Sequence, residues 1–446
     1  MPFRRWSLLS HPARRYLLHI AMQTGGLAVA GLFFNLAILA LGYERSFLGL
    51  LNTAAVVAAA ALSLPLWWLA GRLGLRRSLL LAALLQGGCV LSYGLWPAPG
   101  PLLLAVAVGG AASVLSEVSG APFMMRHSDP DSRDDLFSAA AAIGIGVAGV
   151  SALLAGGLPG LFAQLLDVAP ESGVAYRATF LVAGSLALLA LLPLLRLDET
   201  RDERGAQAAT AGIDTIPAGP PQPPPTPEPS VAPPELNTQH SKLKTALLER
   251  LPPAVRGLAE RPWPVLRLLL SPFLISWGAA LLIPYLNLFF KDRYDISDGA
   301  LGAIFAALGI ITGLASLAAP LLSRRIGKMP TIVLTQALSI PFLLALGFVP
   351  LLGVAVAAML VRAALFNMGS PLYQAFAMEQ TDESARPIVI GLLNGAYTAG
   401  YLLAPTISTL TQERYGFGPL FVATTLCYGL AAVVNFALFL RPRAGR

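Results

Sequence analysis

Two charged side chains stand alone inside long apolar stretches, and they are the residues best suited to chemistry. Glu117 and Arg362 are the pair. Because an isolated charge is costly in apolar surroundings, such residues normally face a water-filled cavity or each other. A carboxylate there could bind a proton in one conformation and release it in another, and a guanidinium could hold an anionic group of a solute. Two structural roles compete: a fixed ion pair, or hydrogen bonds between Glu117 and Ser113, Ser116 or Ser119.

A repeated six-residue motif allows the depths of these two charges in the membrane to be compared. GAPFMM begins at Gly120 and GSPLYQ begins at Gly369, an offset of 249 residues. The same shift sets Arg362 against Ser113, near the middle of its apolar run. Glu117 follows four residues later, roughly 6 Å along a helix. We therefore expect Arg362 close to the midplane of the bilayer and Glu117 one helical turn nearer the cytoplasm.

Five further polar side chains are candidates for the same cavity: Asn35, Asn287, Asn367, Asn394 and Tyr397. Asn35 and Asn287 are separated by 252 residues, close to the repeat offset, and should sit at similar depth. Asn394 and Tyr397 are three residues apart and can share a helix face. Such residues also join membrane helices to one another. A cavity with few polar and many apolar contacts favours an amphipathic or largely apolar solute.

The elements that must position these residues are membrane-spanning helices. Charged residues are only 12% of the chain and hydrophobic residues 55%, whereas about a quarter of a soluble domain is charged. A span needs about 20 apolar residues. Twelve segments qualify: 16–41, 47–70, 77–96, 101–124, 136–166, 177–196, 265–290, 298–322, 330–349, 351–374, 388–411 and 418–440. The fold class is therefore an all-α integral membrane protein, and Gly156, Gly157 and Pro159 predict an early end to the fifth helix.

A short hydrophilic turn occurs twice and divides the chain into halves. GRLGLRR spans residues 71–77 and RRIGK spans residues 324–328, with Gly74 and Gly327 offset by 253. A repeat of this size is half of the protein. The residues with a candidate gating role in these turns are Arg72, Gly74, Arg76, Arg77, Arg324, Arg325, Gly327 and Lys328. Their bases could bond helix carbonyls or lipid phosphate, or they could serve only to set topology.

Basic residues predict the orientation, because basic loops stay on the cytoplasmic side. With the first span leaving the cytoplasm, most loop arginines and lysines lie inside and both termini are cytoplasmic. The net charge of +7 then belongs to that face, so nucleic acid is not an expected partner. We expect a monomer in the cytoplasmic (inner) membrane, in contact with membrane lipids.

Residues 198–262 differ from the rest and separate the halves 1–197 and 263–446. The proline-rich stretch cannot bury enough apolar area to order itself, and we expect an extended cytoplasmic linker. Leu243, Leu247, Leu248 and Leu251 could form one face of a short amphipathic helix. A tether and a partner-binding segment are both compatible with this composition.

Twelve spans in two sets of six, a long central loop and the two glycine-arginine turns resemble the major facilitator superfamily. The resemblance implies a two-bundle fold, a central cavity lined by the first, fourth, seventh and tenth spans, and a charged turn that closes the inward gate. Ala70, Arg72, Gly74 and Arg76 fit the usual turn motif, as do Arg325, Gly327 and Lys328. Gly71 and Arg324 stand where the motif has acids, so the usual charge latch is not expected.

Other chemistry is excluded or left without support. The phosphate-binding pattern G-x-x-x-x-G-K-[ST] is absent, the histidines lack metal-ligand spacing, and Cys89 and Cys427 lie in apolar runs. We therefore expect no enzyme, cofactor or metal. The expected function is secondary transport of a small solute by alternating access, with protons as the coupling ion. A sensor or partner-binding protein that no longer transports, and a lipid transporter, are the alternatives.

Overall fold

A computed structural model of the chain describes residues 10–197, 263–382 and 385–440. The predicted linker, with its proline-rich stretch and its amphipathic segment, lies outside the described residues. Twelve helices in the described part are long and apolar enough to cross a membrane. They correspond one to one with the twelve predicted spans, so the protein is an all-helical integral membrane protein.

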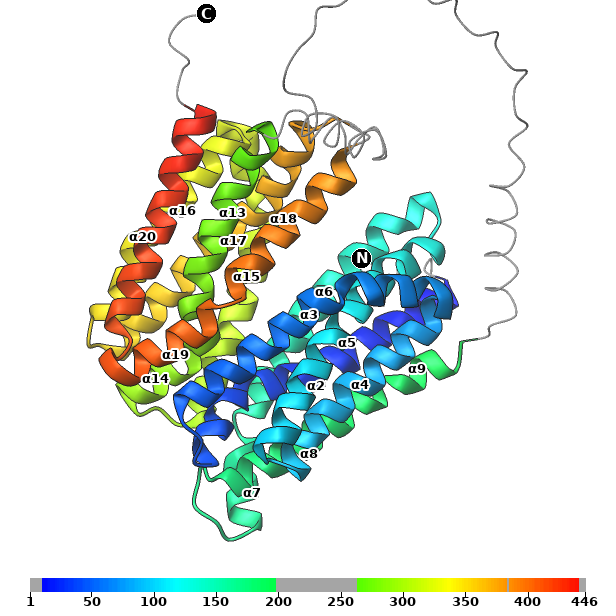
Figure 1. The fold of residues 1–446 in the computed structure, drawn as a ribbon, viewed down its shortest axis with the longest axis vertical. Coiled ribbons are helices and arrows are strands. Elements are labelled where there is room, and N and C mark those ends of the chain that lie inside the picture. Colours follow the sequence, from blue (N-terminus) through cyan, green and yellow to red (C-terminus); the bar gives the residue numbers. More distant parts are fainter. Residues whose placement is uncertain (1–9, 198–262, 383–384, 441–446) are drawn as a thin grey trace, which may run out of the picture. The chain divides into compact units, whose positions relative to one another are not determined.

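The first half contains six spans, two of which are interrupted. The helices are α2 (His11–Ala40), α3 (Arg45–Leu73), α4 (Leu75–Leu95), α5 (Pro99–Arg126), α6 (Pro130–Ala155), α7 (Leu158–Leu165), α8 (Gly173–Leu189) and α9 (Leu191–Leu195). Within this half α2 packs against α6 and α8, α4 packs against α5 and α8, and α3 packs against α5 (Figure 1).

The second half repeats this arrangement. Its elements are α13 (Trp263–Leu282), η2 (Ile283–Tyr285), α14 (Leu286–Tyr294), α15 (Asp298–Ile326), α16 (Lys328–Phe348), α17 (Leu352–Glu379), α18 (Arg386–Tyr401), α19 (Ala404–Tyr415), α20 (Gly418–Asn435) and η4 (Phe436–Leu440). Here α13 packs against α18 and α20, α16 against α17 and α20, and α15 against α17. Equivalent helices thus have equivalent neighbours, as expected of a duplicated bundle.

Proline accounts for three of the breaks within spans. Pro159 lies in the first turn of α7 and Pro405 in the first turn of α19, so the fifth and eleventh spans each bend at matching places. Pro284 lies in η2 and interrupts the seventh span. Proline lacks an N–H and clashes with the preceding helical turn. The break in the fifth span was predicted from its glycines and proline, whereas those in the seventh and eleventh were not.

The two repeated turns need glycine for a backbone reason. Gly74 has φ +83° and joins α3 to α4, and Gly327 has φ +92° and joins α15 to α16. Other residues rarely adopt a positive φ. The sequence repeat therefore marks one helix-joining geometry used twice.

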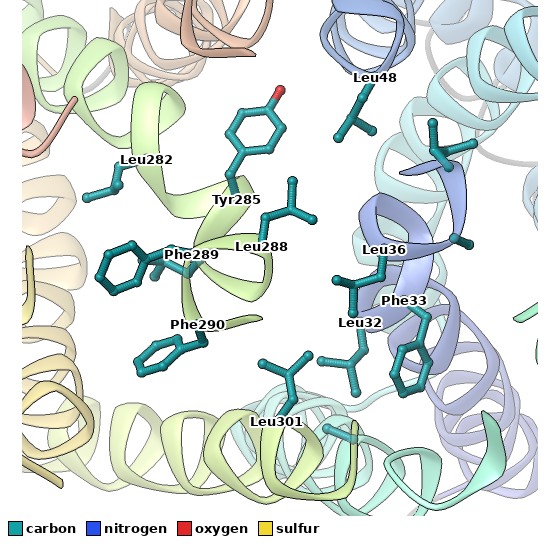
Figure 2. Packing of buried hydrophobic residues seen from close by; sticks show 14 of the residues in the cluster. Leu32, Phe33, Leu36, Leu48, Leu282, Tyr285, Leu288, Phe289, Phe290 and Leu301 are labelled. Atoms are coloured by element: carbon teal, nitrogen blue, oxygen red, sulfur yellow. The ribbon is translucent and has the colours of Figure 1, made fainter. Parts of the chain in front are cut away.

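The halves share one buried apolar cluster (Figure 2). Leu32, Leu36 and Leu48 come from the first half, and Leu288 and Leu301 from the second. Helix pairs α6–α15 and α3–α19 also contact each other across the halves. Burial of these side chains holds the two bundles together by the hydrophobic effect.

Candidate functional site

The two repeats meet through a reciprocal pair of asparagines. The Asn35 Nδ2 atom donates to the Pro284 carbonyl oxygen at 2.6 Å and to Asn287 Oδ1 at 3.0 Å. The Asn287 Nδ2 atom donates to the Leu32 carbonyl oxygen at 2.9 Å. Both side chains are buried. In this conformation the two amides are occupied by each other and by backbone of the opposite half.

Charged residues surround this contact at the ends of the helices. Arg45 lies 2.6 Å from Asp292 and donates to Gln412 at 3.0 Å. Lys291 forms ion pairs with Glu171 and, at 2.8 Å, with Asp298. The Tyr176 hydroxyl lies 3.1 and 3.2 Å from the Asp298 carboxylate oxygens. We call the region defined by Arg45, Glu171, Lys291, Asp292 and Gln412 the junction end.

We call the helix ends that carry Gly74 and Gly327 the turn end. Their polar contacts differ from those at the junction end. Arg76 donates to the carbonyl oxygens of Leu194 and Leu195, each at 3.0 Å. Lys328 pairs with Glu379. Each of these contacts remains within one half. Several hydrogen bonds and ion pairs join described residues of the two halves. They include the Arg45–Asp292, Lys291–Glu171 and Tyr176–Asp298 contacts, the Asn35–Asn287 contact, and bonds of Asn52 to Tyr285 and of Thr53 to Thr406.

Among the described residues, Arg72, Arg324 and Arg325 form no hydrogen bond or ion pair with the other half. The Arg72 guanidinium lies 3.7 Å from the Trp68 ring centroid, and Arg324 and Arg325 are exposed. Arg77 lies in the first turn of α4. The carbonyl bonds of Arg76 are the kind of contact expected for a motif that has lost its acids.

Three of the predicted cavity residues line one cavity in the second half. Asn367, Asn394 and Tyr397 border a space of about 280 Å³ among α13, α16, α17 and α18. Gln336, Tyr373 and Gln374 line the same cavity, and the sequence interpretation did not include them. The Asn367 amide already donates to the Ala363 carbonyl oxygen at 2.9 Å.

Arg362 precedes the cavity residue Phe366 by one turn of α17 and is 4% exposed. The Arg362 charge and the Tyr428 side chain interact electrostatically. Phe366, a cavity residue, stacks on the Tyr428 ring at 4.4 Å. The Arg362 Nε atom has no hydrogen-bond partner, and no ion pair among the described residues includes Arg362. The arrangement is a buried cation without a counter-ion.

A second cavity, of about 460 Å³, lies among α2, α3, α4 and α5 of the first half, and Pro284 of η2 in the second half also lines it. Its polar lining includes Asn35, Asn52, Gln86 and Ser113. Glu117 follows Ser113 by one helical turn and shares its face of α5. Glu117 is exposed. Among the described residues it has neither a counter-ion nor a hydrogen bond from a serine, so the structural roles considered for it are not observed.

Sequence reasoning missed a related pair of glutamines. Gln86 accepts from Gln23 Nε2 at 2.7 Å, and Gln336 accepts from Asn435 Nδ2 at 3.1 Å. Each borders the cavity of its own half. The two glutamines are 250 residues apart, close to the repeat offset. This spacing of about one repeat could have identified the two glutamines as an equivalent pair in the sequence.

Sequence comparison identifies the family. The model of the Major Facilitator Superfamily matches residues 17–405 and again residues 268–446. The chain belongs to this superfamily of secondary transporters, whose members are not enzymes, and a transported small molecule is implied. No curated protein matches the sequence.

Solved structures share the fold at low sequence identity. A bacterial homolog of the human lysosomal transporter Spinster, inward-facing and unoccupied, has TM-score 0.73 and 15% identity, covering 96% of each chain. A D-xylose–proton symporter has TM-score 0.68 and 15% identity, covering 96% of this chain and 98% of that chain. The nucleoside transporter NupG has TM-score 0.66 and 13% identity, covering 97% of this chain and 99% of that chain. These likenesses concern the fold.

Proposed function

We propose that this transporter carries a small amphipathic solute across the cytoplasmic membrane by alternating access, with protons as the coupling ion. The two halves would rock about the Asn35–Asn287 contact. The distribution of basic residues favours a cytoplasmic position for the turn end, and the junction end would then face outward. Closure at the junction end then corresponds to a conformation open to the inside, the state named for one structure of similar fold.

The substrate would bind with its anionic or strongly polar group near Arg362. The observation that carries this proposal is the buried Arg362 guanidinium, which has no carboxylate partner among the described residues. It lies on α17 one helical turn before Phe366, which lines the cavity together with Asn367, Asn394 and Tyr397. A buried cation is costly unless it is paired, and a substrate anion would relieve that cost. Pro272, Ile275 and Leu393 in the same lining would contact the apolar part of the solute.

Glu117 would carry the proton. It lies on the face of α5 that borders the first-half cavity, and no described side chain pairs with it. Rocking of the halves would change how much water reaches the carboxylate, and desolvation changes proton affinity. A carboxylate with no fixed partner can therefore take up a proton in one conformation and release it in the other.

The direct test is thermal unfolding of the purified protein against a library of organic acids, amines and neutral amphipathic solutes at two pH values. A solute that binds the folded state raises the apparent melting temperature. We expect hits among organic acids with an apolar body, and these hits should vanish in Arg362→Ala. Proteoliposome uptake of each hit then measures transport.

The result that would overturn the substrate proposal is full stabilisation of Arg362→Ala by the same solutes. Tyr415→Phe, an exposed tyrosine change on α19, serves as a control for handling and detergent effects. Absence of hits in the unchanged protein would favour lipid transport or a partner-binding role over transport of a small solute.

A further inference from the structure

An apolar groove runs along the surface of the second-half helical bundle, on the side away from the cavity that Asn394 and Tyr397 border. It has a volume of about 540 Å³ and lies between α13 and the α20–η4 helix, with Ala396 of α18 also in its lining. Its walls are mainly the side chains of Leu266, Leu270, Phe273, Val433, Ala437 and Leu438.

The groove faces the surroundings of the bundle. Leu266, Leu270 and Phe273 follow the i, i+4, i+7 spacing of one helix face, and they are 52%, 44% and 37% exposed. Ile275, which lines the second-half cavity, projects from the opposite face of α13. In a membrane-spanning helix, an exposed apolar face of this kind contacts lipid.

One cation interrupts the apolar lining. Arg267 lies in the groove, and its guanidinium lies 5.5 Å from the Phe439 ring centroid. Its Nε atom is buried and has no hydrogen-bond partner among the described residues. The described residues that line the groove include no acidic side chain. The groove therefore combines a hydrocarbon-like wall with an unsatisfied donor on a positive charge.

The position of the charge along the span agrees with a membrane surface. Arg267 lies four residues after Trp263, the first residue of α13. Trp263 is 65% exposed and also lines the groove. Tryptophan is enriched at the level of the lipid headgroups. The cation is thus near the end of the groove where a lipid phosphate would lie.

We propose that this groove binds one anionic phospholipid, with its phosphate at Arg267 and an acyl chain between α13 and α20. The bound lipid contacts α13, α18 and α20 together and stabilises their packing. Neither the transported solute nor the Glu117 site takes part, so this site and the proposed function can be tested separately.

The test compares lipids that differ only in headgroup charge. The purified protein is titrated with dioleoyl phosphatidylglycerol or dioleoyl phosphatidylcholine in mixed micelles, and native mass spectrometry counts retained lipids while thermal unfolding is followed. We expect one retained phosphatidylglycerol and weaker retention of phosphatidylcholine. Arg267→Gln should weaken phosphatidylglycerol binding by about tenfold, since a hydrogen bond to a charged group is lost.

Two further variants separate the charge from the groove. Ala437→Trp should also reduce retention, because the indole fills the space for the acyl chain. Arg15→Gln removes the same charge from α2, 252 residues earlier in the chain, and should retain the lipid. Arg267→Lys should recover part of the phosphatidylglycerol preference.

Three outcomes would overturn the proposal. Equal retention of phosphatidylglycerol and phosphatidylcholine would show that Arg267 does not select the phospholipid by charge. An equal loss of bound phosphatidylglycerol in Arg267→Gln and Arg15→Gln would show a general effect of surface charge. Stabilisation by inorganic phosphate equal to that by phosphatidylglycerol, unchanged in Ala437→Trp, would show a phosphate site without an acyl-chain groove.

Discussion

Asn35 and Asn287 occupy equivalent positions of the two repeats, and each donates its side-chain amide to the backbone of the other half. Equivalent residues can meet in this way only near the axis that relates the repeats. The break at Pro284 makes the contact possible, because it frees the carbonyl oxygen that Asn35 reaches at 2.6 Å. The first and seventh spans therefore differ in shape where they touch.

Loss of this contact should loosen the junction end. Asn35→Leu leaves Asn287 Oδ1 without its partner from the other half and removes the bond to the Pro284 carbonyl. Asn287 Oδ1 keeps the Leu288 N–H as a donor, so the unsatisfied group is the Pro284 carbonyl oxygen. Such a group costs about 1–3 kcal/mol, so this conformation should become less populated. Spin labels at Glu44 and Arg293, both exposed at the junction end, should show a broader and longer distance distribution.

Asn435→Leu is the matched control for that experiment. Asn435 is also buried and donates to Gln336, but both residues belong to the second half. Its loss should lower the melting temperature without changing the distance between the labels. An unchanged distance in Asn35→Leu would mean that the asparagine pair does not hold the halves together.

The ion pairs at the junction end should differ in strength. Lys291 and Asp298 have side chains 10% and 6% exposed, whereas Arg45 and Asp292 are 22% and 40% exposed. Breaking a buried pair costs about 3–5 kcal/mol, and an exposed pair is worth about 0–1 kcal/mol. Lys291 and Asp298 both belong to the second half, but the Asp298 carboxylate also contacts Tyr176 of the first half. Opening the junction end would hydrate the unpaired carboxylate, so the label distances should increase far more in Lys291→Met than in Arg45→Met.

A second change should rescue the first. Lys291→Met leaves the Asp298 carboxylate buried without its cation, and Asp298→Asn removes that charge while keeping an acceptor for the Tyr176 hydroxyl. The double variant should recover most of the closed population. If it opens as far as Lys291→Met alone, the buried charge is not the cause.

Hydropathy predicted the twelve spans because membrane crossing imposes length and composition on each helix. It could not predict the breaks at Pro284 and Pro405, since proline is tolerated in membrane helices when other groups satisfy the backbone. The repeat offset predicted that Asn35 and Asn287 lie at similar depth. Their mutual contact could not be predicted, because it depends on how the two halves pack. The grouping of Asn394 with Tyr397 followed from helical spacing, whereas Gln336 and Tyr428 reach that region from other helices.

Close backbone contact between the halves should be sensitive to a single methyl group. A Cβ atom on Gly302 would lie 2.5 Å from the Ala152 carbonyl oxygen and 2.9 Å from Gly156 Cα. Gly302→Ala must push α6 and α15 apart, at a cost of about 1–3 kcal/mol. Gly309→Ala, on the same helix, would meet Gly149 Cα at 3.8 Å and should be tolerated. Equal label distances in the two variants would exclude tight packing at Gly302.

Glu117 gives the prediction that bears most directly on coupling. Glu117→Gln keeps the size of the side chain but cannot exchange a proton. If Glu117 carries the coupling proton, uptake driven by a pH gradient into proteoliposomes should fall to the level seen without a gradient. Exchange of labelled for unlabelled solute should continue, because exchange needs no net proton movement.

The pH profile supplies a second readout, with Glu413→Gln as its control. Glu413 is an exposed carboxylate on α19, so this substitution removes the same charge elsewhere. Uptake by the unchanged protein and by Glu413→Gln should vary with pH, and uptake by Glu117→Gln should not. Because no described residue pairs with Glu117, the substitution should leave the melting temperature nearly unchanged. A retained pH dependence in folded Glu117→Gln would assign the coupling proton to another group.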